Sequence, residues 1–203
     1  MYDAAEAGDF DTVKRLVDAE PAFPDRKDWF YPCRERDYAL QAAAENGHED
    51  MCCLLLERGA DVHFHDDMPL QMAAFAGRAK VVRRLLRKGA NVHGNRGRSL
   101  VYAAENGHAE VCQILLDNGA NVHAYKNESL WLAALKGHFD VVELLLNNGA
   151  NVHAVNNEAF RQSVLKGHVK ISQLLVQRGA DVHARGPELF WTFIKNVVGG
   201  HIL

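Results

Sequence analysis

The chain has 203 residues, of which 48% are hydrophobic and 24% are charged, and its formal net charge at pH 7 is −3. This balance excludes a protein that binds nucleic acid or membranes through overall basic charge. The sequence has no apolar run near the roughly 20 residues that cross a membrane, and residues 1–6 lack the features of a signal peptide. We therefore expect a cytoplasmic location, with the four cysteines as reduced thiols because their spacing fits no metal site.

One five-residue motif recurs through the chain at a constant spacing. Gly-Ala-Asp/Asn-Val-His occurs five times, 30 residues apart, beginning at Gly59, Gly89, Gly119, Gly149 and Gly179. A fixed period of this length is typical of a repeat array, in which short units stack because none buries its apolar face alone. We therefore predict a single solenoid domain over residues 1–203.

Each unit is predicted to be a helix–turn–helix. In the fourth unit, residues 99–106 fit a first helix, and Gly107 stands where a helix ends in a left-handed residue. Residues 109–118 fit a second helix with one apolar face, closed by Gly119. The units are expected at residues 2–20, 37–66, 67–96, 97–126, 127–156 and 157–186, with a C-terminal cap at 187–203.

The two ends of the array depart from this template. Residues 21–36 form an insertion whose prolines argue against a helix. The aromatic residues of this loop leave two interpretations open, because it either folds onto its own repeats or binds a partner. The cap is also rich in aromatic residues, so either its helix lies flat and buries Phe190, Phe193 and Ile194, or the chain comes from a longer array.

The repeated unit resembles the ankyrin repeat. The resemblance rests on Ala-Ala-Glu-Asn-Gly-His at 103–108, followed by Ile-Leu-Leu-Asp-Asn-Gly-Ala-Asn-Val at 114–122, and on parallel runs in the other units. It covers residues 2 to about 197, with five strong copies and two weaker end copies. The shortened unit is also similar to ankyrin arrays of giant viruses, which would place the protein in the cytoplasm of a host.

The ankyrin unit has 33 residues, whereas the unit here has 30, and the difference lies before the first helix. We therefore predict an all-α ankyrin-repeat solenoid of stacked helix–turn–helix units, with short turns in place of β-hairpin fingers. Asp or Asn precedes most first helices and is expected to cap them. These residues are Asp37, Asp67, Asn127 and Asn157, with Gly97 at the same position in the fourth unit.

The 11 histidines do not predict a metal site. Most form two columns with one residue per unit, at positions such as His123 and His108. Packed helices lie about 8–10 Å apart, whereas zinc ligands lie about 2.0–2.1 Å from the metal, so neighbours in a column do not share an ion. A repeat array also lacks the unique convergence of groups that catalysis needs. We expect no enzymatic activity, no metal and no cofactor.

Charge is uneven along the chain. Residues 78–98 contain eight basic residues and no acid. They are either a solvated outer helix face or a docking site for an acidic partner, and a nucleic-acid partner is disfavoured because no groove-reading element accompanies them.

The resemblance implies that the protein binds a protein partner through its concave face and turn tips, as a monomer. The alternative is the ankyrin portion of a larger adaptor whose effector segment is absent from this chain. The candidate contact residues are aromatic, basic or apolar side chains at first-helix and tip positions, because such residues dominate interface energetics. They are Phe64, Phe75, Arg96, Arg98, Tyr125, Lys126, Trp131, Leu135, Lys136 and Leu165.

Overall fold

The computed structural model describes residues 1–19, 32–183 and 187–199, which contain thirteen helices and no strand. The prediction of an all-helical repeat fold without β-hairpin fingers is therefore confirmed. The helices are α1 (Tyr2–Glu6), α2 (Phe10–Ala19), α3 (Pro32–Asn46), α4 (Glu49–Glu57), α5 (Phe64–Phe75), α6 (Ala79–Arg87), α7 (Gly94–Glu105), α8 (Ala109–Asp117), α9 (Ala124–Lys136), α10 (Phe139–Asn147), α11 (Ala154–Leu165), α12 (Val169–Gln177) and α13 (Pro187–Gly199). In the part of the chain so described, no helix is both long and apolar enough to cross a membrane.

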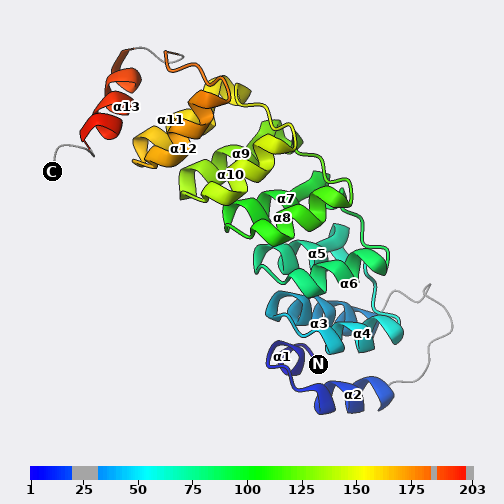
Figure 1. Cartoon of the computed structure of the whole chain (residues 1–203). Coiled ribbons are helices and arrows are strands. Elements are labelled where there is room, and N and C mark those ends of the chain that lie inside the picture. The colour runs from blue at the N-terminus through cyan, green and yellow to red at the C-terminus, as the bar shows by residue number, and fades with distance from the viewer. Residues whose placement is uncertain (20–31, 184–186, 200–203) are drawn as a thin grey trace. The chain divides into compact units, whose positions relative to one another are not determined.

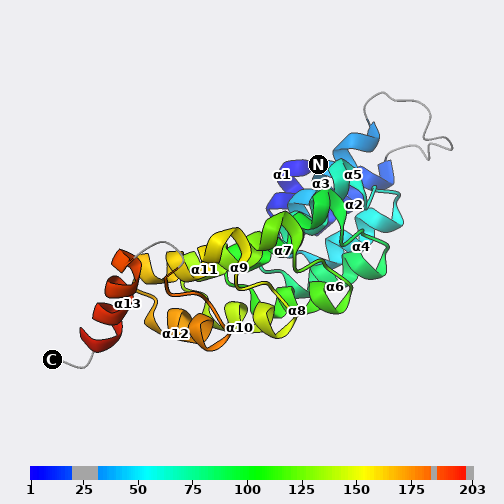
Figure 2. The same ribbon diagram turned by 90° about the horizontal axis from the view of Figure 1, so that it is seen from above.

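The helices α1 to α12 form six consecutive antiparallel pairs, and α13 follows the last pair (Figure 1). The chain divides into two compact units. The first unit is Met1–Asn95 and the second is Arg96–Leu203. Within each unit the first helices of the pairs lie along one side and the second helices along the other (Figure 2). In the second unit, for example, α9 and α11 lie on one side and α10 and α12 on the other. Each unit is thus two layers of helices with the core between them.

The core repeats with the sequence. Leu115, Leu145 and Leu175 are completely buried at equivalent positions of successive second helices. The paired alanines of the first helices, such as Ala133 and Ala134, are also completely buried. Each buried leucine contributes about 1.5–3 kcal/mol of transfer free energy, and the methyl-sized alanines let neighbouring helices approach closely. Stacking therefore supplies stability that one pair lacks.

The glycine at the end of a first helix meets two requirements. Gly107 has a φ of +78°, which side-chain-bearing residues rarely adopt. A Cβ atom at this position would lie 2.6 Å from Nδ1 of His138 in the next pair. Glycine therefore both ends the helix and leaves room for the histidine of the following unit.

The short turns at the tips have an unusual backbone. Three consecutive residues, Tyr125, Lys126 and Asn127, have φ values of 48°, 59° and 63°. The same left-handed run occurs at residues 65–67 and 155–157, and at residues 95–97 it ends in a glycine. Left-handed helical geometry costs roughly 1–2 kcal/mol per L-residue. The shortened connection is therefore a single left-handed turn, held in place by the contacts around it.

The expected N-caps serve a different purpose. Oδ1 of Asn127 accepts hydrogen bonds from the backbone N–H of Asn151 (2.8 Å) and from Nδ1 of His123 (3.2 Å). Asp67 Oδ1 accepts the equivalent pair of bonds, and Asp37 and Asn157 each accept the backbone N–H 24 residues further on. The prediction of helix caps was wrong for Asp67, Asn127 and Asn157, because the left-handed turn directs their oxygens toward the neighbouring turns. Asp37 lies inside α3, which begins at Pro32. These hydrogen bonds, here called the Asx ladder, tie successive turns together.

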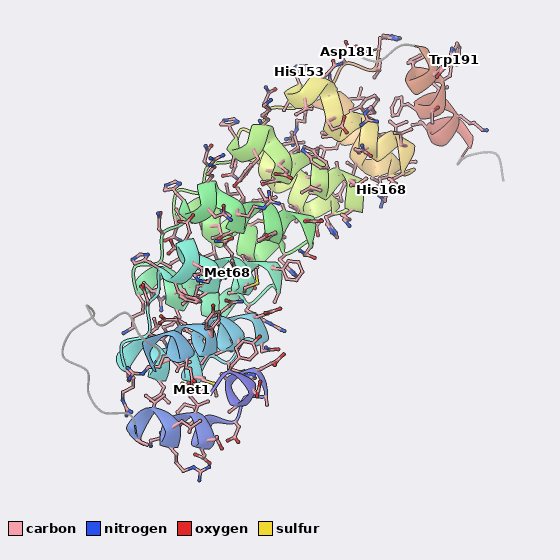
Figure 3. The ribbon with its side chains drawn as sticks, turned by 180° about the vertical axis from the view of Figure 1, so that it is seen from behind. Met1, Met68, His153, His168, Asp181 and Trp191 are labelled. Carbon is pink, nitrogen blue, oxygen red and sulfur yellow. The ribbon has the colours of Figure 1, made fainter. Side chains whose placement is uncertain are left out.

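Both ends of the array were only partly predicted. Most of the 21–36 insertion lies outside the described residues, but α3 begins at Pro32, so residues 32–36 are helical and not loop. Proline is tolerated there because the first residue of a helix needs no N–H donor. In the cap, α13 places Phe193 edge-on against Phe160 with ring centroids 5.4 Å apart. Trp191, labelled in Figure 3, remains 65% exposed.

Candidate partner-binding surface

The candidate surface is the exposed side of the first helices together with the tip turns, here called the first-helix face. In each left-handed turn the third residue is buried, whereas the first two are mostly exposed. The buried position is nearly constant, as Asp67, Asn127 and Asn157 show, because it carries the hydrogen-bond ladder. The exposed positions differ in every turn. A fixed backbone thus presents variable side chains.

A polar and aromatic cluster occupies this face in the second unit. The guanidinium carbon of Arg98 lies 5.2 Å from the ring centroid of Tyr102 and 5.1 Å from that of Tyr125. Nη1 of Arg98 forms an ion pair with Oε2 of Glu128 at 3.0 Å. This cluster links α7 to α9. Two of the predicted residues, Arg98 and Tyr125, are thereby brought together. Tyr102 and Glu128 join them, and no sequence pattern indicated these two residues.

Apolar side chains follow along α9 and α11. Leu165 is 57% exposed, and Leu135 and Trp131 are half-buried. Lys136 is exposed, with Nζ 3.9 Å from Oε1 of Glu105. A side chain as apolar as Leu165 gains about 25 cal/mol for each Å² that a partner covers. Leu135 and Leu165 therefore offer a partner apolar area near the ends of α9 and α11, whereas the charged cluster lies at the start of α9.

The first unit places its two predicted phenylalanines differently. Phe75 is 42% exposed at the end of α5, whereas Phe64 is only 7% exposed. The Phe64 ring stacks on His65 with a centroid distance of 4.0 Å and meets Tyr38 edge-on at 4.8 Å. Phe64 is thus a packing residue of the turn. Tyr38 is a further exposed aromatic residue of this unit, which sequence reasoning missed because its column holds a different kind of residue in other units.

Some cations of the basic segment bond other residues of the chain, although Arg78 among them is exposed. Nε of Arg78 donates to the carbonyl oxygen of Glu45 (2.9 Å), and Nη2 of Arg84 pairs with Oε1 of Glu49 (3.1 Å). Lys80, Arg87 and Lys88 are exposed on or directly after α6. Arg96 and Lys126 are exposed in the tip turns of the second unit. Lys80, Arg87 and Lys88 therefore lie on or beside a second helix, away from the first-helix face.

Histidines form hydrogen bonds within and between neighbouring repeats. Nε2 of His138 donates to the carbonyl oxygen of Glu105 (2.9 Å), and Nε2 of His168 donates to that of Leu135 (3.1 Å). In the other column, His63, His123 and His153 each bond the Asp or Asn side chain four residues further on. Figure 3 labels His153 and His168, which lie at opposite ends of the same helix pair. Arg78 replaces histidine in the third unit and makes the same kind of bond with Nε. Among the described residues, no three His, Cys, Asp or Glu side chains gather as a metal site would require.

Two of the cysteines are poor nucleophiles. Burial raises the pKa of Cys52 to about 12 and that of Cys112 to about 12. A thiol is reactive as the thiolate, which a buried apolar environment disfavours. These thiols therefore belong to the core and not to a reactive centre.

Comparison with known families agrees with this geometry. A family model described as ankyrin repeats (3 copies) matches residues 1–96, 43–126 and 100–186. A search of curated proteins finds no significant match. The matched ranges span most of the sequence, and the helix pairs from α3 to α12 follow the 30-residue period. The chain belongs to the ankyrin-repeat family.

Proposed function

We propose that this protein binds a protein partner through its first-helix face and performs no chemistry of its own. Ankyrin repeats are generally protein–protein interaction modules, and the family is typically non-enzymatic. The observation that carries the proposal is the contrast within each tip turn. A buried Asx ladder fixes the backbone, while the exposed residues above it change from turn to turn. Such an arrangement suits recognition better than catalysis.

The second unit supplies the anchors of this surface. Leu165 and Leu135 give apolar area, and Arg98 and Tyr125 give a cation and an aromatic ring that are held by contacts within the chain. Aromatic residues and arginine carry much of the energy of protein interfaces. Because Arg98 is already oriented by Tyr102 and Glu128, a partner would lose less entropy in fixing it.

An acidic segment of the partner is the best complement for α6. Lys80, Arg87 and Lys88 are exposed there, and the described part of α6 contains no acid. Surface cations of this kind speed association and select acidic partners more than they add affinity. The protein is proposed to act in a reducing compartment such as the cytoplasm, because Cys52, Cys53 and Cys112 are free thiols.

The test is affinity capture from cells of the organism that encodes the protein. The bait variant carries Leu135→Glu and Leu165→Glu on the first-helix face. The matched control carries Asn147→Glu and Gln173→Glu, which add the same charge at exposed positions of the second helices α10 and α12. Proteins held by the wild type and the control, but lost by the first-helix variant, support the proposal. Identical capture by all three baits, with circular dichroism unchanged, contradicts it.

A further inference from the structure

An open hollow of about 400 Å³ lies on the first-helix face of the first unit. Its lining comes from the start of α1 and the start of α3. The lining residues are Met1, Tyr2, Asp3, Glu35 and Tyr38. The hollow is of the size of small-molecule sites, and none of its residues was singled out from the sequence.

The walls of the hollow are anchored by the fold. Ala5 of α1 and Ala39 and Leu40 of α3 are completely buried, and each lies within two residues of a lining residue along the chain. The Tyr38 ring meets Phe64 edge-on at 4.8 Å and His65 at 5.9 Å. Tyr38 therefore has a fixed orientation, although 38% of it is exposed. Tyr2, the first residue of α1, is 39% exposed.

The chemistry of the lining favours a cation. Two tyrosine rings offer π faces, and the carboxylates of Asp3 and Glu35 are both exposed. Within the described part of the chain, no basic side chain lines the hollow, and its one cation is the α-ammonium group of Met1. The lining therefore carries two carboxylates against one ammonium and keeps a net negative charge. Aromatic faces beside carboxylates attract a cation through the ring quadrupole and through direct charge interaction. An anionic ligand would be repelled, and a purely apolar one would leave the carboxylates partly desolvated.

The second unit shows how this chain holds such a cation. Arg98 lies 5.1 and 5.2 Å from the rings of two tyrosines, with a glutamate oxygen at 3.0 Å. Tyr38 occupies in its helix the position that Arg98 occupies 60 residues later. The first unit thus presents two tyrosines and carboxylates without the arginine. A guanidinium suits this setting better than an ammonium, because its plane stacks on aromatic rings and pairs with carboxylates.

We propose that the hollow between α1 and α3 receives an arginine side chain of the protein partner. This inference rests on the proposed function for its biological meaning, because the arginine is supplied by the partner of the first-helix face. The chemistry of the hollow itself is independent of who the partner is. It is therefore open to test with a small probe.

The experiment uses the full chain labelled with ¹⁵N and three capped tripeptides, in which arginine, lysine or citrulline stands between two glycines. Citrulline has nearly the shape of arginine without its charge. We expect saturable amide shifts at residues 2–3 and 35–38 with the arginine peptide, affinity lower by about threefold or more for lysine, and no saturation with citrulline. Equal shifts with citrulline, or shifts confined to other residues, would overturn the inference.

Two variants separate the hollow from a general acidic surface. Glu35→Gln is expected to weaken binding of the arginine peptide about threefold to tenfold, and Tyr2→Leu by a similar factor. Glu57→Gln removes the same charge from an exposed position at the end of α4 and is expected to change nothing. If Glu35→Gln and Tyr2→Leu both bind the arginine peptide with wild-type affinity, and their spectra are those of a folded protein, the proposal is overturned. Peptide binding at the hollow combined with unaltered partner capture by the Leu135/Leu165 variant would retain this inference and remove the proposed function.

Discussion

At the scale of single residues, the Asx ladder is the feature on which the turns depend. Asn127 is buried, and its Oδ1 receives bonds from one backbone N–H and one histidine. Asn127→Ala removes the acceptor for both and leaves a part-buried N–H without a partner. We expect a loss of about 2–3 kcal/mol in the free energy of unfolding, measured by urea denaturation. Asn147→Ala, at an exposed position of α10, serves as the control and is expected to change little.

The Asx ladder is interrupted at Gly97, and a substitution at this position is therefore predicted to raise the free energy of unfolding. Glycine offers no side-chain oxygen to the N–H of Asn121, which is 24 residues further on, as in the other rungs. The φ of Gly97 is +84°, in the left-handed region that asparagine tolerates, and an added Cβ would lie 3.6 Å from the nearest atom, Cβ of Ala124. Gly97→Asn should therefore raise the free energy of unfolding by about 1 kcal/mol.

The control for that substitution lies three residues earlier. A Cβ at Gly94 would meet Oδ2 of Asp67 at 2.7 Å, so Gly94→Ala should lower the melting temperature. If Gly97→Asn destabilises the protein as much as Gly94→Ala does, the ladder is not a repeating element of this fold.

The buried thiols predict a specific chemical reactivity. Because burial raises the pKa of Cys52 and Cys112 to about 12, both remain protonated at pH 8 in the folded chain. A pulse of iodoacetamide at pH 8 should modify them only after unfolding in urea, as mass spectrometry of the peptides would show. Rapid modification of Cys112 in the native protein would contradict its place in the core. The same raised pKa values mean that stability falls as the pH rises from about 9 toward 12.

At the scale of the element, the left-handed turn carries strain that depends on its sequence. Val155 has φ 50° and ψ 42°, where a β-branched residue is a genuine outlier, and it is 45% exposed. Val155→Asn should relieve this strain with little loss of burial and raise the free energy of unfolding by about 1 kcal/mol. The matched change Val152→Asn puts an amide at a buried position with an ordinary φ and should destabilise by about 2 kcal/mol. If the melting temperatures of both variants shift in the same direction, Val155 does not strain the left-handed turn.

The helices themselves were predictable, and the turns were not. Glycine positions and apolar periodicity locate both helices of each pair, because helix ends and core faces are local properties. The missing three residues per unit exclude a hairpin, but they leave the handedness of the remaining turn open. An Asp or Asn residue directly before a helix usually predicts a side-chain cap of the helix N-terminus. Here the oxygens of Asn127 and its equivalents bond residues 24 positions away, which no local pattern reveals.

At the scale of the whole molecule, the repeat period identifies the fold family and indicates which first-helix positions are exposed. Phe75 and Leu165 lie exposed where a repeating column places them, so the period was a sufficient guide. The hollow lined by Tyr2 and Tyr38 was missed, because α1 and α3 are separated by a 39-residue step from Gly8 to Gly47 and not by the 30-residue period. Which residues of α1 and α3 lie together across this irregular spacing depends on how the two helices pack, and the sequence period does not show it.

The most direct measurement of the central claim is site-specific photo-crosslinking in cells of the natural source. A benzophenone amino acid is placed at position 165, on the first-helix face, or at position 173, exposed on the second helix α12. The account predicts a discrete protein adduct from position 165 and none of comparable yield from position 173. Adducts formed only from position 173, or equally from both, would contradict the claim that the first-helix face is where this protein meets its partner.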